Sequence, residues 1–218
     1  MKLTIVSGRE VDEVLDSTDG VTGLINAIAT AFRDYSSGKV RMPQRTVIHL
    51  DNDWWGVMPC GARNLGFSVK IVNVIESNKV RGLPTTQGIV VLMDDITGQP
   101  MAVIDGTALT AWRTAAATAV SIKYLARSTD NLAIIGAGLQ ARYHVLLLSR
   151  AFPIKRILIY SRTREKVVEL AKLAQGRGID AVATDSSHDA IRQADVVITA
   201  TTSREPVIHG SWLHEACT

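Results

Sequence analysis

Two glycines separated by one residue, with a small residue three positions later, carry the clearest chemical signal in the sequence. They are Gly136, Gly138 and Ala141, and they directly follow the apolar run Leu132–Ile135. Gly136 permits a tight turn out of a strand, Gly138 leaves the backbone open to a phosphate, and Ala141 lets a helix pack closely. The N-terminus of that helix offers free N–H groups and a positive dipole end. We therefore predict a dinucleotide-binding turn over Gly136, Ala137, Gly138 and Leu139.

The residues after the next predicted strand, Arg156–Tyr160, indicate which dinucleotide binds. NAD-specific sites usually carry Asp or Glu at this point, to accept the ribose hydroxyls. This chain has Ser161, Arg162 and Thr163 instead. Two hydroxyls and a guanidinium suit the additional phosphate of NADP(H). We predict that NADP(H) is preferred and that NAD(H) is possible.

Two further hydroxyl residues follow the fourth predicted strand of this region, Asp195–Ala200. They are Thr201 and Ser203. Ligands of open α/β sheets lie beyond the carboxyl ends of the strands. We predict that both residues contact the cofactor, although they could equally be ordinary loop hydroxyls.

Three basic residues of the first half stand in apolar surroundings. Lys70 lies within an apolar strand pattern, Arg113 within an alanine-rich helix pattern, and Arg45 opens a strand. An uncompensated charge in an apolar element is costly, and the same segments show no obvious acidic partner. A bound carboxylate would serve as that partner. Surface exposure of the charged ends, or an ion pair elsewhere in the chain, would serve equally well.

The second half alternates strands with helices, which predicts a parallel sheet with right-handed crossovers. The expected strands are 132–135, 156–160, 180–183 and 195–200, and the expected helices are 139–149, 164–175 and 187–193. The fold class is therefore α/β, with a Rossmann-type doubly wound sheet.

The first half predicts an α+β domain. Helical periodicity covers residues 10–37, with a break at Gly20 and the Ser17–Asp19 cluster and a cap at Thr18 or Asp19. Short strands are expected at 46–50, 54–58, 68–74, 88–94 and 100–105, with a hairpin turn at 94–98, and a long helix at 107–126. We place the domain boundary near 127–130, which gives a first domain over 1–127 and a second over 128–218.

Composition excludes several classes of protein. The chain has 218 residues with a net charge of +3 and shows no block of like charges, so we expect no nucleic-acid partner. Apolar runs are far shorter than the roughly 20 residues of a membrane helix, and we expect no membrane partner. Two distant cysteines, Cys60 and Cys217, and five histidines without ligand spacing predict no metal site. The absence of a secretory signal pattern and of a disulfide framework favours the cytoplasm.

Five segments resemble the ornithine cyclodeaminase/mu-crystallin family, in the family's order and spacing. They are Met42–Arg45, Gly66–Lys70, Gly82–Gly88, Asp105–Thr114 and Ile135–His144. The resemblance implies an NAD(P)-dependent enzyme that acts at the α carbon of an amino or cyclic imino acid. It implies that Arg45, Lys70 and Arg113 handle the substrate carboxylate, with Lys70 also catalytic. It further implies that Thr86 and Gln140 lie near the cofactor, and that the first domain forms a homodimer.

Three functions remain open. A ketimine reductase that uses NADP(H) is the first, and an ornithine cyclodeaminase or an archaeal-type alanine dehydrogenase is the second. A non-catalytic, crystallin-like NADP(H)-binding protein is the third. The chain ends before the segment that carries the catalytic aspartate of the family, so we expect the parallel sheet to be incomplete at its C-terminal side. Asp195 starts a strand at the wrong end of the sheet to replace that aspartate.

Overall fold

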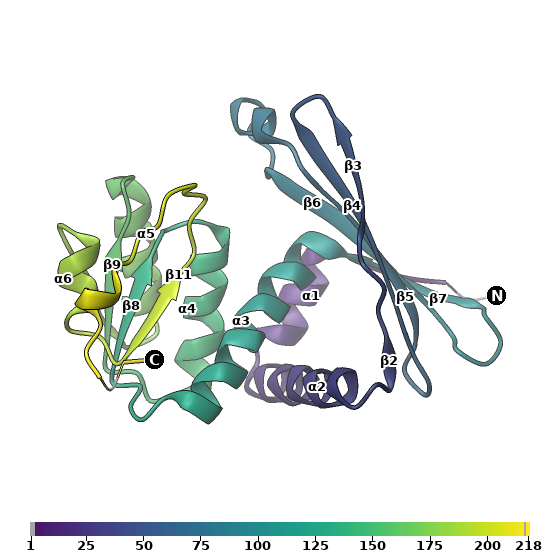
Figure 1. The fold of residues 1–218 in the computed structure, drawn as a ribbon, viewed down its shortest axis with the longest axis horizontal. Coiled ribbons are helices and arrows are strands. Elements are labelled where there is room, and N and C mark those ends of the chain that lie inside the picture. The colour runs from purple at the N-terminus through teal and green to yellow at the C-terminus, as the bar shows by residue number, and fades with distance from the viewer. Residues whose placement is uncertain (1–2, 216) are drawn as a thin grey trace. The chain divides into compact units, whose positions relative to one another are not determined.

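The computed structural model describes residues 3–215 and 217–218, and the chain forms two compact units (Figure 1). The first unit comprises Met1–Leu15 and Ala27–Thr110, and the second comprises Asp16–Asn26 and Ala111–Thr218. Helices α2 (Thr18–Ser36) and α3 (Gly106–Leu125) therefore contribute residues to both units. The division falls inside α3, whereas the domain boundary predicted at 127–130 follows that helix and stays a prediction.

In the described part of the chain, the first unit holds a seven-stranded sheet in the order β1-β7-β6-β5-β4-β2, with β3 beside β4. The strands are β1 (Thr4–Val6), β2 (Val40–Arg41), β3 (Thr46–Leu50), β4 (Asp53–Ala62), β5 (Gly66–Val74), β6 (Thr86–Met93) and β7 (Pro100–Asp105). All neighbours run antiparallel except β1 and β7. The five predicted strands are confirmed with somewhat different ends, while β1 and β2 were not predicted.

The register of this sheet separates its side chains into two faces. Pairing aligns Pro59, Val69, Val91, Val103 and Ile5 in one row across five strands, and Val57, Ile71 and Ile89 in the adjacent row. Directly paired residues lie on the same face of a sheet. These two rows form what we call the apolar face, and Ile5, Ile71 and Ile89 are exposed on it.

The helical region at the N-terminus divides into α1 (Gly8–Leu15) and α2. The break lies at Asp16 and Ser17, at the start of the segment that the sequence indicates, while Gly20 lies inside α2. The predicted cap at Thr18 or Asp19 is wrong. Ser17 is the cap, because its hydroxyl oxygen accepts a hydrogen bond from the Gly20 N–H at 3.0 Å. The short 3-10 helix η1 (Glu76–Arg81) connects β5 to β6.

Helix α3 starts in close contact with the sheet of the first unit. A Cβ atom on Gly106 would lie 2.7 Å from the carbonyl carbon of Gly88, and a Cβ on Gly88 would lie 2.5 Å from the Ile71 carbonyl oxygen. The helix therefore begins against the backbone of β6 at Gly88, where Gly106 leaves no room for a side chain, and the β5 backbone limits the space at Gly88 itself. The Asp105 carboxylate accepts a hydrogen bond from the Ala108 N–H at 2.7 Å and caps the first turn.

The second unit contains a parallel sheet in the order β10-β9-β8-β11. Its strands are β8 (Asn131–Ile135), β9 (Arg156–Tyr160), β10 (Asp180–Ala183) and β11 (Val196–Thr199), and its helices are α4 (Leu139–Ala151), α5 (Arg164–Gln175), α6 (Ser187–Ile191) and the 3-10 helix η2 (Gly210–Trp212). The predicted α/β class and Rossmann-type sheet are confirmed. Each predicted strand and helix of this half is present.

Both faces of the parallel sheet are buried, as parallel sheets require. Ala133, Ile135 and Leu158 pack against α6 residues in one cluster. The residues that alternate with them, among them Ile134 and Ile157, are fully buried as well. At the β11 edge, the Thr218 N–H donates to the Asp195 carbonyl oxygen at 2.9 Å. The Thr218 carbonyl oxygen accepts from the Val197 N–H, also at 2.9 Å.

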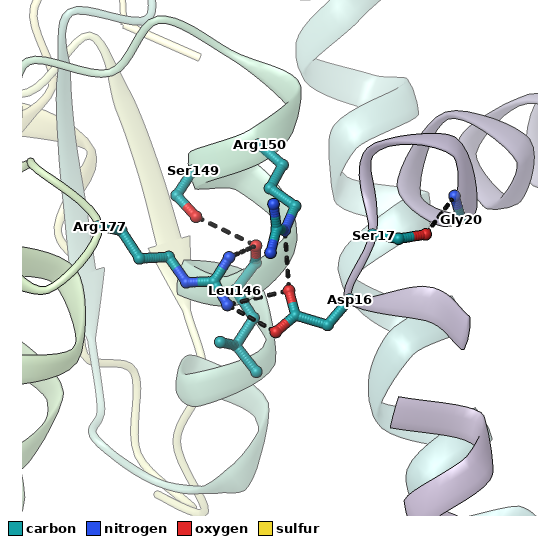
Figure 2. A network of polar contacts seen from close by, with 7 residues as sticks. All are labelled: Asp16, Ser17, Gly20, Leu146, Ser149, Arg150 and Arg177. Carbon is teal, nitrogen blue, oxygen red and sulfur yellow. Dashed lines mark hydrogen bonds and ion pairs between the residues drawn. The ribbon is translucent and has the colours of Figure 1, made fainter. Parts of the chain in front are cut away.

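An ion-pair cluster joins the first residues of the second unit to the rest of it (Figure 2). The Asp16 carboxylate accepts hydrogen bonds from Arg177 at 2.7 and 2.9 Å and from Arg150 at 2.9 Å. Arg177 also donates to the Leu146 carbonyl at 3.4 Å. Partial burial raises the pKa of Asp16, but the two arginines outweigh it and hold that pKa below its ordinary value. The segment 16–26 is thereby fixed to α4 and to the loop before β10.

Candidate functional site

The predicted dinucleotide-binding turn lies between β8 and α4, and its first glycine is required by the backbone. Gly136 has φ +111°, in the left-handed region. Its N–H donates to the Tyr160 carbonyl at 2.8 Å, and the Ala200 N–H donates to the Ile135 carbonyl at 2.8 Å. A Cβ on Gly136 would lie 2.2 Å from the Ala200 carbonyl oxygen. The turn is therefore held between the ends of β9 and β11.

The second glycine of the turn has a different environment. Gly138 is the N-cap of α4 and has an extended backbone. Because it has no side chain, it caps none of the free N–H groups of the first turn. A Cβ at this position would meet nothing within 4 Å. The protein itself thus leaves space in front of the first turn of α4, where the helix dipole and N–H groups favour an anion. Leu139 is exposed beside this space, and Ala137 is half-buried.

The first turn of α4 also carries an acceptor that lacks a donor. Among the described residues, the buried Gln140 Oε1 has no hydrogen-bond partner. Unpaired buried polar atoms are uncommon and costly. Ala141 is fully buried and lets the helix pack closely, as predicted. A sugar hydroxyl or an amide N–H would satisfy Gln140, so the residues at this turn fit a dinucleotide.

The residues that follow β9 lie at the same edge of the sheet, because the strands run parallel. Ser161 is half-buried, while Arg162 and Thr163 are exposed. The Thr163 N–H donates to the Ser161 hydroxyl at 3.5 Å. The structure brings these three residues to the edge that carries Gly136, as the sequence predicts.

A hollow of about 410 Å³ lies at the exit of β11. Its lining includes the predicted residues Thr201 and Ser203 and also Thr199, Glu205, Pro206, Val207 and Ile208. The Thr201 hydroxyl accepts from the Ser203 N–H at 2.9 Å, and the Ser203 hydroxyl donates to the Glu205 carbonyl at 2.8 Å. These contacts fix the loop. Sequence reasoning missed Glu205 to Ile208, because only their place after β11 distinguishes them.

Asp195 lies at the opposite end of the parallel sheet. Its carboxylate accepts hydrogen bonds from the Asn131 N–H at 2.8 Å and from the Ser128 hydroxyl at 3.0 Å. It therefore anchors the start of β8. This agrees with the expectation that Asp195 does not serve as a catalytic acid.

In the first unit, the register aligns two of the three predicted basic residues. Lys70, on β5, pairs with Met58 of β4, on the face opposite the apolar face, and is half-buried. Arg45 directly precedes the first pair of β3 with β4, Thr46 with Val57, so the same register continues from Arg45 to Met58. Two strand spacings separate Arg45 from Lys70, or about 10 Å between their backbones. Thr86 begins β6 and is half-buried opposite Val74.

A second hollow, of about 350 Å³, lies in the first unit. Its polar lining comprises Asn73, Gln87, Asp105 and Thr107, and Trp55 forms part of its apolar wall. The buried Asn73 Oδ1 has no partner among the described residues. Asn73 and Gln87 lie on the faces of β5 and β6 opposite Lys70 and Thr86, and they were not identified from the sequence.

Arg113 belongs to the second unit, where it is exposed on α3. Arg45 and Lys70 belong to the first unit. The assignment of all three residues to one substrate carboxylate therefore stays a prediction. In the part of the chain that the structure describes, no cluster of three or more His, Cys, Asp and Glu side chains could bind a metal. No helix within the same residues has the length and apolar character needed to span a membrane.

Known proteins resemble this chain in sequence across nearly its whole length. A profile of the ornithine cyclodeaminase/mu-crystallin family matches residues 8–217. The ketimine reductase mu-crystallin of Rattus norvegicus is 34% identical over 209 residues, which cover 93% of this chain and 66% of that protein. An alanine dehydrogenase of Archaeoglobus fulgidus is 32% identical over 217 residues, 99% of this chain and 65% of that protein. The chain thus spans about two thirds of the length of these relatives.

Solved structures agree with the sequence comparisons. The Δ1-pyrroline-2-carboxylate reductase of Thermococcus litoralis, in complex with NADH and L-proline, superimposes with a TM-score of 0.90 at 32% identity. The alignment covers 98% of this chain and 67% of that one. An archaeal alanine dehydrogenase dimer with bound NAD also gives a TM-score of 0.90 at 32% identity, over 100% of this chain and 66% of that one.

Proposed function

The chain belongs to the ornithine cyclodeaminase/mu-crystallin family, and from this premise we propose an NADP(H)-dependent oxidoreductase that acts at the α carbon of an amino or cyclic imino acid. A ketimine reductase is the reaction type we favour. The observation that carries the proposal is the turn before α4, where a Cβ on Gly138 would meet nothing within 4 Å and the first turn of the helix can hold a phosphate. Relatives with NADH and with NAD bound support a nicotinamide dinucleotide.

Three groups of residues in the second unit would bind three different parts of the cofactor. The first turn of α4 would hold the pyrophosphate over Gly138. Ser161, Arg162 and Thr163 would bind the 2′-phosphate, since no carboxylate stands there to prefer a free ribose hydroxyl. Thr201 and Ser203 would face the far end of the cofactor. The bound dinucleotide supplies a hydride, and the residues of the chain supply its orientation.

Basic residues would bind and orient the substrate. The Arg45 and Arg113 guanidiniums would fix the carboxylate, and with it the position of the α carbon. Lys70 would assist at the carboxylate and hold a proton at Nζ for the reacting nitrogen. The register that aligns Lys70 with Met58, next to Arg45, supports a shared role for the two residues of the sheet.

We further propose that the apolar face of the first unit is covered by a second copy of the chain. Isolated apolar side chains at a surface are ordinary, but a contiguous apolar patch usually marks an interface. Two adjacent rows of the sheet are apolar from β4 to β6, and one of them continues to β1. The dimer described for the archaeal alanine dehydrogenase supports the same assembly.

A titration of the chain with NADPH and NADH tests the cofactor assignment. We expect NADPH to bind more tightly, and Arg162→Ala to weaken NADPH at least about tenfold while NADH changes little. Arg156→Ala is the matched control, because Arg156 begins the same strand at its other end and pairs with Asp180. Tighter binding of NADH, or equal losses of both nucleotides in Arg162→Ala, would contradict the preference.

Turnover separates the remaining functions. Consumption of NADPH with Δ1-pyrroline-2-carboxylate would support a reductase. Release of ammonia from ornithine without net change of the cofactor would instead indicate a cyclodeaminase. Binding of NADPH without turnover of any amino or imino acid would favour a binding protein. In the enzyme, Arg113→Ala should raise the KM of the carboxylate substrate far more than the Kd of NADPH.

A further inference from the structure

His144 is a buried titratable residue to which neither the cofactor nor the substrate proposal assigns a role. It lies in the second turn of α4 and is 3% exposed. Its Nδ1 atom lies 2.7 Å from the Gln140 carbonyl oxygen, and its Nε2 atom lies 2.9 Å from the Thr118 hydroxyl. Both ring nitrogens are therefore engaged inside the second unit.

The two contacts assign the tautomer of the ring. A carbonyl oxygen only accepts hydrogen bonds, so Nδ1 must carry the proton that it donates to Gln140. In the neutral ring, Nε2 then accepts from the Thr118 hydroxyl. Burial lowers the pKa of His144, against the opposing effect of the Gln140 carbonyl. Burial thus favours the neutral ring. The Thr118 hydroxyl, which also lies 3.4 Å from the Thr114 carbonyl oxygen, then donates to Nε2.

This bridge joins two helices with separate assignments in the proposed function. Thr118 lies on α3, the helix that also carries Arg113. Gln140 lies in the first turn of α4, two residues after Gly138. Beside the bridge, Trp112 of α3 meets Tyr143 of α4 edge-on, with ring centroids 5.3 Å apart. The aromatic pair supplies packing, and the imidazole supplies a directional contact.

We propose that His144 is a positioning residue that fixes the first turn of α4, and with it the dinucleotide-binding turn, against helix α3. The inference rests on the proposed function, since it assigns a role toward the bound dinucleotide. His144 acts through its neighbours: Nδ1–H restrains the Gln140 backbone, and Nε2 ties that backbone to Thr118. Loss of the bridge would let the first turn of α4 shift relative to α3.

Two substitutions of Thr118 test this inference with little change of volume. Thr118→Val removes the hydroxyl and keeps the shape, so we expect the Kd of NADPH to rise about three- to tenfold. Thr118→Ser keeps the hydroxyl and should bind within about twofold of the unchanged chain. His144→Phe should weaken binding at least as much as Thr118→Val. The double variant should show less than the sum of the two effects, because one bridge is lost in each case.

The stoichiometry of binding separates a positioning role from a merely structural one. A variant of which a fraction is irreversibly misfolded would bind less NADPH per chain with an unchanged Kd, and circular dichroism would detect a fraction that unfolds reversibly and raises the apparent Kd. The positioning role predicts full stoichiometry with a raised Kd. In a working enzyme it also predicts a lower kcat for Thr118→Val than for Thr118→Ser. Nitrogen NMR of His144 should show the Nδ1–H tautomer.

The outcomes distinguish this inference from the proposed function. An unchanged Kd in both Thr118→Val and His144→Phe would overturn the inference alone, as would the Nε2–H tautomer. Failure of the unchanged, folded chain to bind either nucleotide would overturn the proposed function, and the inference with it. The tautomer measurement needs no nucleotide and reports on the bridge in either case.

Discussion

The sheets of the two units differ in how completely one chain covers them. In the parallel sheet of the second unit, Ile134, Ile157 and Ile159 are 0% exposed. In the sheet of the first unit, Ile71 and Ile89 are 39% and 43% exposed, although they occupy central strands. Strand residues of the same type thus lie in opposite environments within one molecule.

The difference follows from the connections between strands. Parallel neighbours need crossover helices, and those helices cover the sheet. Antiparallel neighbours need only short turns, so a face is covered only where another element or another molecule provides the cover. Helices of the second unit therefore cover its sheet, whereas Ile71 and Ile89 stay exposed on the apolar face of the first unit.

The largest difference in folding and assembly should come from placing an aspartate at a central strand position in each of the two sheets. Ile134→Asp would bury an unpaired carboxylate, at a cost on the order of 5 kcal/mol or more, and should prevent folding of the second unit. Ile71→Asp should leave each chain folded and convert the proposed dimer into monomers. Circular dichroism would report the folding, and analytical ultracentrifugation would report the assembly.

Val80→Asp is the control for this comparison, because Val80 is 89% exposed on η1 and does not belong to the two rows of the apolar face. It should change neither folding nor assembly. If the protein without substitutions is a monomer, or if Ile71→Asp remains a dimer, the apolar face is not the interface.

An intermediate effect should separate the two glycines at the ligand edge of the buried sheet. Gly136→Ala combines an unfavourable φ with a clash against the Ala200 carbonyl, and should lower the free energy of unfolding by about 2–4 kcal/mol. Gly138→Ala should change stability by less than about 1 kcal/mol, because its Cβ meets open space. It should nevertheless weaken NADPH binding, because the methyl group would occupy the phosphate space.

Denaturant unfolding and NADPH titration of the same two variants would measure both effects. If Gly138→Ala bound NADPH as well as the unchanged chain, the pyrophosphate would not lie over this turn. Equal stability losses in the two variants would contradict the distinction between a structural and a ligand-facing glycine.

The smallest effect should come from the ion pairs of Asp16, which belong to the second unit alone. Asp16→Asn should lower the free energy of unfolding by about 1–2 kcal/mol at neutral pH. Because the pKa of Asp16 is lowered in the folded chain, its contribution is present above the unfolded-state value near pH 4 and is lost as the pH falls below it. The unchanged chain and the variant should therefore converge in stability in acid.

Hydrogen exchange would localise that loss. Amides of α4 and of the segment 16–26 should exchange faster in Asp16→Asn, while amides of β5 and β6 should not change. Arg9→Ala is a fitting control, because the Arg9–Glu13 pair is exposed and lies within α1. Faster exchange in the first unit as well would contradict the assignment of Asp16 to the second.

The sequence predicted most elements because their patterns are local. Apolar runs between turn residues identified β3, β5, β7 and β9, and alanine content identified α3. The strand β1 was missed because it consists of three residues whose pairing partner, β7, lies about a hundred residues away. The cap at Ser17 was misplaced by one or two residues, because Ser17, Thr18 and Asp19 are all good capping residues.

The candidate site was predictable where chemistry follows a fixed spacing. The turn around Gly136 and Gly138 can be recognised from its residue types and from its place between a strand and a helix. The hollow at Glu205 does not, because its lining comes from a loop without a distinctive pattern. His144 could not be interpreted either, since its role depends on Thr118, which lies 26 residues earlier in the chain.

Residues 16–26 belong to the second unit, although the rest of that unit begins at residue 111. This affects whether the unit could fold or be inherited by itself. A fragment starting at residue 111 would contain every strand of the four-stranded parallel sheet, yet it would lack Asp16 and the buried side chain of Val21. The Arg177 contact with Asp16 spans 161 residues, so this part of the unit can assemble only after most of the chain has been synthesised. Recombination at a single breakpoint could not transfer either unit intact, and we expect the two to be inherited together.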